Sequence, residues 1–327
     1  MVAVIVNVLD LLRLSGVLLT FMYLVAALSV GGLLALQASV NLQLGKAVGT
    51  PYGAAAVQLA VSAAVLAVVA GAAGGVTALG SLGDARWWML LGGIASPIYI
   101  TSAIALFPRL GALASVGLFV TGQMFASIAL DLGGLLGVER RPLGLGMVLG
   151  GVTVLTGIVV VIRSQLAGEA ARTAVSARVG WIVLGLAAGA VLPVQGAVNA
   201  ALRRELDDPF ATGLWSFLVA TGTIVVAVIA LVATNRTPMP RVAALTTVPW
   251  WGWLGGLAAA TYVTVTFSVI PHIGAATTIA LTVTGQQLVS AAIDHRGWFR
   301  LPAKPVTTAR LGGLAALIAG CVLVQLA

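Results

Sequence analysis

The chain has 327 residues, of which 60% are hydrophobic and only 8% are charged, with a formal net charge of +8 at pH 7. A soluble domain carries about 25% charged residues, so this composition excludes a soluble protein and predicts an integral membrane protein. The basic residues are scattered between apolar runs and form no stripe, which argues against a nucleic-acid partner. The single cysteine, Cys321, excludes an internal disulfide and a cysteine-based metal cluster.

Long runs without Asp, Glu, Lys or Arg predict the membrane spans, because each is near the ~20 residues that a helix needs to cross a bilayer. Eight such runs are 14–45, 47–83, 87–108, 110–130, 142–162, 179–202, 209–235 and 311–327. A further run, 242–293, is divided in two by Pro271-His272. The expected fold class is therefore an all-α membrane protein of ten transmembrane helices. The alternation of apolar and polar residues typical of membrane β-strands does not occur.

The second half of the chain repeats the first. Gln37 and Asn41 are matched by Gln195 and Asn199, each 158 positions later. Further along, the matches lie 163 positions apart, which places a five-residue insertion in the second copy. These later pairs are Trp87-Trp88 with Trp250-Trp251, Gly92-Gly93 with Gly255-Gly256, Tyr99 with Tyr262, Pro108 with Pro271, Gly122-Gln123 with Gly285-Gln286, and Asp131 with Asp294.

The repeat divides the chain into a first five-helix unit at 1–162, a polar linker at 163–178 and a second unit at 179–327. Because five is an odd number, the second unit must enter the membrane in the opposite sense to the first. The prediction is an inverted-topology repeat, a design that many secondary transporters use. The distribution of Lys and Arg over the loops favours a topology with both termini outside the cytoplasm.

These motifs resemble a known family. Residues 192–203 read Leu-Pro-x-Gln-x-x-x-Asn-x-x-Leu-Arg, and they are followed by Trp-Trp…Gly-Gly and then by Pro-x-x-Gly-Ala…Gly-Gln…Asp. The combination resembles the YdcZ branch of the drug/metabolite transporter superfamily, with two five-helix units fused over about residues 24–327. The resemblance implies an exporter in the inner membrane and names no cargo. The first copy departs from the pattern, because Ala35 stands where the second copy has Pro193.

An inverted repeat predicts which polar residues meet. Its two-fold axis lies in the membrane plane, so matched residues near helix midpoints converge. Gln123 and Gln286 lie within ~3 Å of their helix midpoints at ~1.5 Å per residue, and we expect both to line one substrate cavity. Tyr99 and Tyr262 are expected to line the same cavity.

Four further amides are substrate-binding candidates nearer the two membrane surfaces: Gln37, Asn41, Gln195 and Asn199. The alternative for all of these amides is a structural role. A Gln or Asn inside a helix bundle can simply hold helices together, typically for ~0.6 kcal/mol. The two tyrosines can likewise be packing residues beside the Gly-Gly pairs.

Acidic residues are absent from the centres of the spans, and only Asp131 and Asp294 come near, at helix ends. They are candidates for ion coupling, since proton-driven transporters often hold a carboxylate at membrane depth. The alternative is that both are interfacial carboxylates that meet a nearby arginine. His272 is expected to be a solvated or capping residue in a short turn. An uncoupled facilitator also fits the sequence.

The prediction for function is a secondary transporter that moves a small neutral or cationic organic solute by alternating access. The alternative is a membrane scaffold that has the same fold and moves nothing. No nucleophile–base set, HExxH motif, Cys-His cluster or phosphate loop occurs, so we expect no enzyme, cofactor or metal. The expected partners are the solute, the lipid bilayer and, through the glycine-rich helices 5 and 10, a second copy of the chain.

Overall fold

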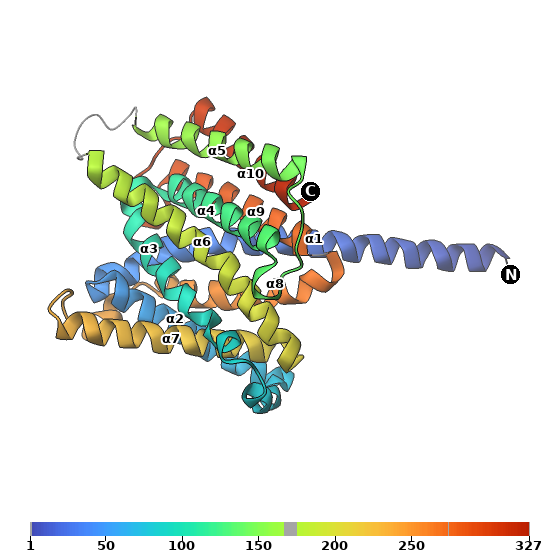
Figure 1. The fold of residues 1–327 in the computed structure, drawn as a ribbon, viewed down its shortest axis with the longest axis horizontal. Helices are drawn as coiled ribbons and strands as arrows, with labels where there is room; N and C mark the ends of the chain where they lie inside the picture. The colour runs from blue at the N-terminus through green and yellow to red at the C-terminus, as the bar shows by residue number, and fades with distance from the viewer. Residues whose placement is uncertain (1, 167–174, 274, 327) are drawn as a thin grey trace.

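The computed structural model describes residues 2–166, 175–273 and 275–326, which form ten α-helices and short 3-10 segments without a β-strand (Figure 1). The α-helices are α1 (Val2–Val48), α2 (Pro51–Ala73), α3 (Ala95–Leu110), α4 (Ala112–Gly133), α5 (Leu145–Leu166), α6 (Val175–Leu206), α7 (Pro209–Ala233), α8 (Leu254–Ile273), α9 (Ala275–Arg296) and α10 (Thr308–Leu326). Half of the predicted linker, residues 167–174, lies outside the described residues.

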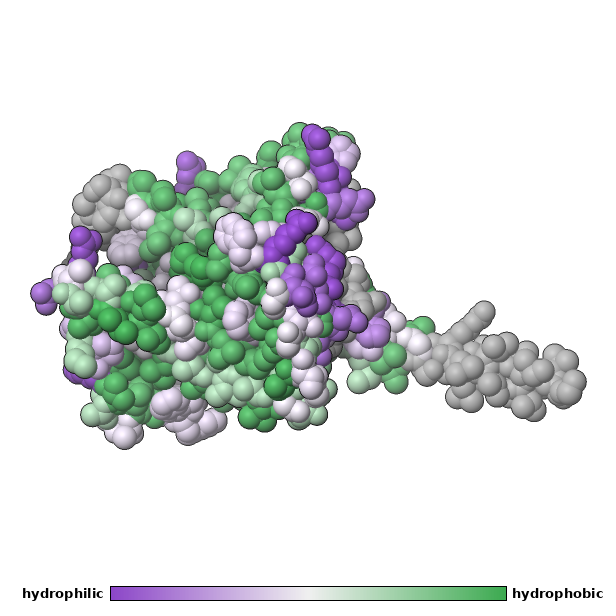
Figure 2. All heavy atoms as spheres, turned by 60° about the horizontal axis from the view of Figure 1, so that its bottom comes forward, coloured by the Kyte–Doolittle hydropathy of each residue, from purple (hydrophilic) through white to green (hydrophobic). Residues whose placement is uncertain are grey.

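Seven of the described helical segments are long and apolar enough to cross a membrane. They are Gly16–Val48, Pro51–Ala73, Trp87–Leu110, Ala112–Gly133, Leu145–Ser164, Val179–Leu206 and Pro209–Ala233. Figure 2 shows a largely hydrophobic side face, with the hydrophilic residues gathered toward the two ends. The prediction of an all-α membrane protein is confirmed, and the number of ten spans stays a prediction.

Several helix ends differ from those that the charge-free runs predict. Helix α1 begins at Val2, well before residue 14, and its N-terminal part projects beyond the bundle in Figure 1. Helix α2 ends at Ala73, because Gly74 adopts a left-handed conformation with φ 79° that terminates an α-helix. Residues 75–83 then form a 3-10 helix, η1 (Gly75–Gly83). His272 lies in the last turn of α8 and not in a separate turn.

Matched residues also start matched helices. Thr50 precedes Pro51 of α2, and its side chain accepts a hydrogen bond from the Gly53 backbone N–H. Asp208, the matched residue 158 positions later, precedes Pro209 of α7 and accepts from the Ala211 N–H at 2.6 Å. A polar N-cap followed by proline at the first helical position is a strong helix start, because it satisfies a free N–H and presets φ.

The helices of the two halves interleave. Helix α1 packs against α8 and α9 of the second half, and α6 packs against α3 and α4 of the first. Helices α2 and α7 pair with each other, as do α5 and α10, which form an outer layer in Figure 1. Each half therefore covers the other, and the core runs continuously through both.

Glycines allow the closest of these crossings. A Cβ atom added to Gly31 of α1 would overlap the Thr282 carbonyl of α9, and one added to Gly189 of α6 would overlap the Phe119 carbonyl of α4. Gly189 stands 158 positions after Gly31, and Thr282 stands 163 positions after Phe119. The same close approach is thus made twice, at matched positions, as the repeated sequence predicts.

The outer pair α5 and α10 meets through matched glycines. A Cβ added to Gly150 would lie 2.7 Å from the Gly320 carbonyl oxygen, and one added to Gly157 would lie 2.7 Å from that of Gly313. The small-residue faces of these helices therefore meet within the chain. The expected homodimer through helices 5 and 10 stays a prediction. A second copy of the chain would have to pack against the outer faces of these helices.

Candidate functional site

A buried polar contact joins the two halves of the chain. Gln286 of α9 donates a hydrogen bond from Nε2 to the Tyr99 hydroxyl of α3 at 3.0 Å. Both side chains are buried, with exposed fractions of 1% for Gln286 and 5% for Tyr99. The Tyr99 ring packs against Phe119 of α4, with ring centroids 4.9 Å apart. Two of the predicted cavity residues are thus in direct contact.

Tyr262 of α8 lies near the same place. It is close enough to Tyr99 for the two phenols to interact electrostatically, and it also lies against Thr282 of α9. Gln123 of α4 is half-buried, and its Nε2 atom has no hydrogen-bond partner among the described residues. The Gln286–Tyr99 pair thus has a third polar side chain, Tyr262, nearby.

A second group of buried amides lies between α1 and α2. Gln58 accepts hydrogen bonds at Oε1 from Gln37 Nε2 at 3.5 Å and from Asn41 Nδ2 at 3.4 Å. Its own amide donates to Ser62 Oγ at 2.9 Å, and Ser62 donates to the Gly256 carbonyl at 3.0 Å. This network joins α1 and α2 of the first half to α8 of the second.

The matched group lies between α6 and α7. Asn199 Nδ2 donates to Ser216 Oγ at 3.0 Å, and Gln195 Nε2 donates to Ser216 Oγ at 3.5 Å and to Ser96 Oγ at 2.7 Å. Ser216 stands 158 positions after Gln58. The same place is therefore occupied by a hydroxyl in one half and by an amide in the other.

Gln58 and Ser216 were not among the predicted site residues, although the sequence carried a signal for them. Both are polar residues at matched positions in charge-free runs, one helix after the Gln-x-x-x-Asn pair. Their side chains accept hydrogen bonds from the amide nitrogens of Gln37, Asn41, Gln195 and Asn199, which supports the structural alternative for these four.

Each asparagine also lies against a glycine of the other half. A Cβ added to Gly255 of α8 would overlap Asn41 Oδ1, and one added to Gly92 would overlap Asn199 Oδ1. Gly92 lies in η2 (Trp87–Ile94), the 3-10 segment that precedes α3. Neither Oδ1 atom accepts a conventional hydrogen bond from the described part of the chain. Each faces a glycine Cα, a weak contact that recurs at close helix crossings.

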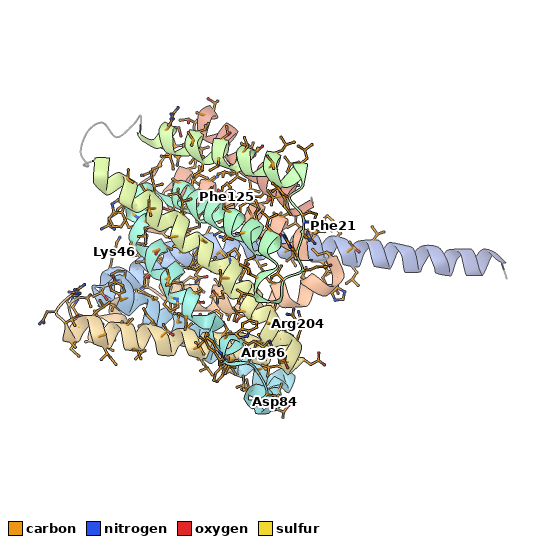
Figure 3. All side chains as sticks on the ribbon, viewed as in Figure 1. Phe21, Lys46, Asp84, Arg86, Phe125 and Arg204 are labelled. Atoms are coloured by element: carbon orange, nitrogen blue, oxygen red, sulfur yellow. The ribbon has the colours of Figure 1, made fainter. Side chains whose placement is uncertain are left out.

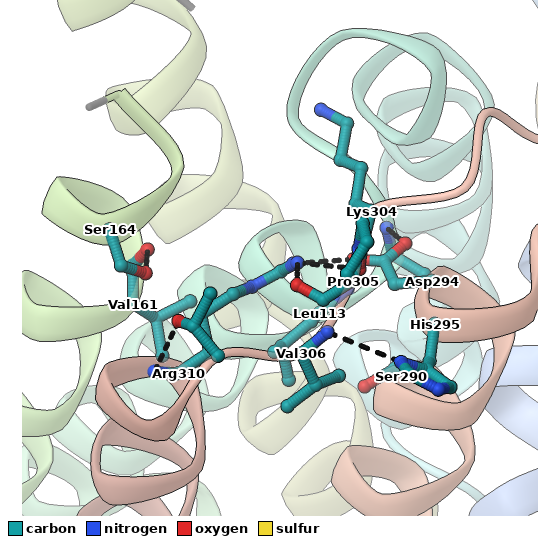
Figure 4. Close-up of polar contacts among 12 residues, drawn as sticks. Leu113, Val161, Ser164, Ser290, Asp294, His295, Lys304, Pro305, Val306 and Arg310 are labelled. Carbon is teal, nitrogen blue, oxygen red and sulfur yellow. Dashed lines mark hydrogen bonds and ion pairs between the residues drawn. The ribbon is translucent and has the colours of Figure 1, made fainter. Parts of the chain in front are cut away.

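Asp294 holds three elements together at one end of the bundle (Figure 4). Its carboxylate accepts hydrogen bonds from the backbone N–H groups of Ala112 at 2.7 Å and Leu113 at 3.0 Å, at the start of α4. It also pairs with Arg310 of α10, whose Nη2 lies 2.9 Å from Oδ2. A carboxylate at a helix N-terminus is stabilised by the free N–H groups and the helix dipole. This geometry supports the alternative in which Asp294 meets an arginine.

Asp131, the matched residue, is half-buried at the end of α4. Its backbone carbonyl accepts from the Arg141 N–H at 2.8 Å, just as the Asp294 carbonyl accepts from the Lys304 N–H at 2.7 Å. The residues matched to the capped N–H groups, Ala275 and Ala276, have side chains outside those described. A group of three or more His, Cys, Asp or Glu residues able to hold a metal ion does not occur in the described ranges.

Two matched pairs place a cationic or titratable residue on an aromatic ring of the other half. The Arg109 guanidinium lies over the Trp181 ring, 4.3 Å from its centroid. His272 stacks on Tyr23 with centroids 4.3 Å apart and an interplanar angle of 6°. His272 stands 163 positions after Arg109, and Trp181 stands 158 positions after Tyr23. Each pair joins the end of one helix to α1 or α6.

Comparison with known proteins identifies the family. The model described as "Putative inner membrane exporter, YdcZ" matches residues 22–160 and again residues 180–323. This chain belongs to the YdcZ family. The two matched regions agree with a fusion of two units, and the family places the chain in the inner membrane as a multi-pass transporter.

No curated protein matches the chain. A solved structure titled "Crystal structure of protein" aligns over 91% of this chain and 99% of its own, with a TM-score of 0.49 and 18% sequence identity.

Proposed function

We propose that this YdcZ-family protein is a secondary transporter that exports a small neutral or cationic organic solute by alternating access. The proposed substrate site is the central group of Tyr99, Tyr262, Gln123 and Gln286. The observation that carries the proposal is the buried Gln286–Tyr99 contact, because it joins the two halves where a central solute would bind. Phenol rings suit apolar and cationic groups, and the amides supply orientation.

We further propose that the ten helices form two inverted repeats. The matched glycine crossings, the matched asparagine–glycine contacts and the matched aromatic pairs all support a two-fold relation between the halves. In such an arrangement one half rocks against the other around a fixed central site. Contacts between the halves then open and close in turn.

Any ion coupling is proposed for Asp131 in preference to Asp294. Both oxygens of Asp294 already accept backbone hydrogen bonds, and Arg310 neutralises its charge. Asp131 is only half-buried, so its carboxylate is more accessible to water. If Asp131 exchanges protons during transport, Asp131→Asn should abolish the pH dependence of solute binding, and an unchanged pH dependence would remove Asp131 from the mechanism.

The test of the substrate site is a thermal-shift screen of the purified protein in detergent with amino acids, sugars, nucleosides and organic cations. A ligand that binds the folded state raises its apparent stability by mass action. We expect a hit to disappear in Gln286→Ala and to persist in Gln287→Ala. Gln287 is an adjacent, fully buried residue that lies near Gly117 of α4 and serves as the matched control.

Two outcomes would count against the site. A hit that survives in both variants places the solute elsewhere. If the double variant Gln123→Leu/Gln286→Leu keeps the ligand-induced thermal shift and every transport phenotype, the scaffold function is favoured. A central transport site cannot lose both amides without effect.

A further inference from the structure

A cluster of basic and aromatic side chains lies at the end of the bundle where α1 ends and α8 begins. We name it the basic–aromatic cluster, and its members are Lys46, Arg241, Arg296, Arg300, Trp251 and Trp298. The four basic side chains are exposed. The central transport site does not use any of them.

Hydrogen bonds and ring contacts bring three separate segments together here. Gln43 of α1 donates from Nε2 to the Phe299 carbonyl at 2.9 Å. The Phe299 ring packs on Trp251, with centroids 5.7 Å apart. On the other side of α1, Arg241 donates from its backbone N–H to the Val48 carbonyl at 3.0 Å and from Nη2 to the Lys46 carbonyl at 3.4 Å. The end of α1 is therefore the common support of the cluster.

The arginines of the cluster lie over tryptophan rings. The Arg300 guanidinium carbon is 5.9 Å from the Trp251 ring centroid, and that of Arg296 is 5.7 Å from the Trp298 centroid. A guanidinium that rests on an aromatic face keeps its N–H groups directed outward, where they can bind an anion. Tryptophan itself prefers the headgroup level of a membrane.

The backbone holds Arg300 in an unusual conformation. Its φ angle is 61°, in the left-handed region that costs energy for residues other than glycine. The matched residue in the first half is Gly137, with φ 76°. The same turn thus accepts glycine at one end of the molecule, and at the other end an arginine is retained despite the strain.

The opposite end has the same backbone and a different charge. The positions matched to Arg296, Trp298 and Arg300 are Gly133, Leu135 and Gly137. Lys46 is matched by Arg204, but the surrounding segments there contain the acidic residues Asp84, Glu139, Glu205, Asp207 and Asp208. By contrast, the segments that build the cluster, 43–52, 234–253 and 295–307, contain no Asp or Glu. Figure 3 shows Lys46 at one end of the bundle and Asp84, Arg86 and Arg204 at the other.

We propose that the basic–aromatic cluster binds the phosphate headgroups of anionic phospholipids and thereby sets this end of the molecule in the cytoplasmic leaflet. The four cations are exposed and lie in segments without Asp or Glu, so they attract anions, and the tryptophans place them at headgroup depth. Asp294, two residues before Arg296, is buried and paired with Arg310. Anionic lipids attract each nearby Lys or Arg in the cytoplasmic leaflet. The proposed inverted repeats give the backbone a near two-fold axis in the membrane plane, so side-chain charge must decide the orientation. This inference does not depend on transport.

The first test measures lipid binding. The purified protein in neutral detergent is titrated with phosphatidylglycerol, phosphatidylcholine or inorganic phosphate, and the rise in melting temperature yields an apparent affinity. We expect a rise with phosphatidylglycerol alone. Arg296→Gln/Arg300→Gln should weaken that affinity about thirtyfold, since each cation near an anionic surface contributes about fivefold. The control pair Arg140→Gln/Arg141→Gln, at the opposite end, should retain it.

A second variant separates binding from folding. Arg300→Gly introduces the residue found at the matched position, so it should keep or raise the melting temperature without lipid while weakening the phosphatidylglycerol effect about fivefold. Equal shifts with phosphatidylcholine, a shift with inorganic phosphate alone, or equal losses in the control pair would overturn the proposal.

The second test measures orientation. Cysteines are introduced singly at Ala303, in the loop that carries Arg296 and Arg300, and at Leu135 at the opposite end, in a chain with Cys321→Ala. In right-side-out membrane vesicles an impermeant maleimide should label Leu135→Cys and should label Ala303→Cys only after the membrane is permeabilised. The reverse pattern would place the cluster on the external face and exclude the proposed leaflet.

Discussion

The side-chain amide of Asn41 in α1 occupies the space that a Cβ atom on Gly255 of α8 would need. The two residues come from different halves of the chain. The contact is repeated by Asn199 and Gly92. It explains why an asparagine recurs in one helix and a glycine in another, because the amide needs the room that only glycine leaves. Motifs that lie more than two hundred residues apart thus form one contact.

Gly255→Ala should lower the stability of the protein by about 1–3 kcal/mol, because the added methyl group would overlap the Asn41 amide in a packed interface. The control is Gly222→Ala in α7, where an added Cβ meets no atom within 4 Å. Thermal unfolding in detergent measures both. In a double-mutant cycle, adding Asn41→Ala to Gly255→Ala should recover part of the lost stability, because removing the amide makes room for the methyl group. Equal melting temperatures for the two alanine variants would contradict the packing argument.

Tyr99→Phe should destabilise the protein by about 1–3 kcal/mol, because it leaves the buried Gln286 donor without a partner. Combining Tyr99→Phe with Gln286→Leu should recover much of that loss, since an apolar pair needs no hydrogen bond. The stability can therefore be restored while the proposed substrate site stays disabled. If the double variant both folds and binds solute as the wild type does, the contact is structural and the site lies elsewhere.

Asp294→Asn should cost about 3–5 kcal/mol, the loss typical of breaking a buried ion pair. The carboxylate accepts hydrogen bonds at the N-terminus of α4 and also pairs with the guanidinium of Arg310. Asp131→Asn is the matched control and should cost much less, because that carboxylate is half-buried. Unfolding midpoints at constant pH would show the difference, and equal losses would mean that Asp131 carries a comparable network.

Gly313→Leu should separate α10 from α5, because the added side chain would strike the Gly157 backbone and Val161. Its neighbour Gly312 faces open space, so Gly312→Leu should leave stability within about 0.5 kcal/mol of the wild type. Melting temperature and size-exclusion chromatography report the two effects separately. A dimer lost in Gly312→Leu at unchanged stability would assign the outer face of α10 to a second copy of the chain.

The contact between Gln286 and Tyr99 shows how much of the candidate site could be predicted from the sequence. Gln286 and Tyr99 were expected to line one cavity because an inverted repeat brings helix midpoints together, and the two side chains are in hydrogen-bond contact. The Nε2 atom of Gln123, a residue expected in the same cavity, has no hydrogen-bond partner among the described residues. Sequence symmetry predicts where a residue lies. It does not predict which of two matched side chains finds a partner, since this depends on rotamers and on neighbours that differ between the halves.

Composition and repeat alone determined the class of the protein. A chain with 8% charged residues cannot cover a water-facing surface, and its charge-free runs have the length of membrane helices. The fixed offsets showed that the chain consists of two copies, and the motifs showed the family. These features are local in sequence or periodic along it, so no knowledge of packing was needed to find them.

Tertiary structure decided what each polar residue does. Only the folded chain shows that Gln58 accepts from the amides of Gln37 and Asn41, that Asp294 caps the start of α4 and that Arg300 lies over Trp251. These contacts join segments 17 to 182 positions apart, so they arise from helix crossings that no local pattern encodes. Inside a membrane an unpaired polar group is costly, and its partner is whatever group the crossing helix presents there.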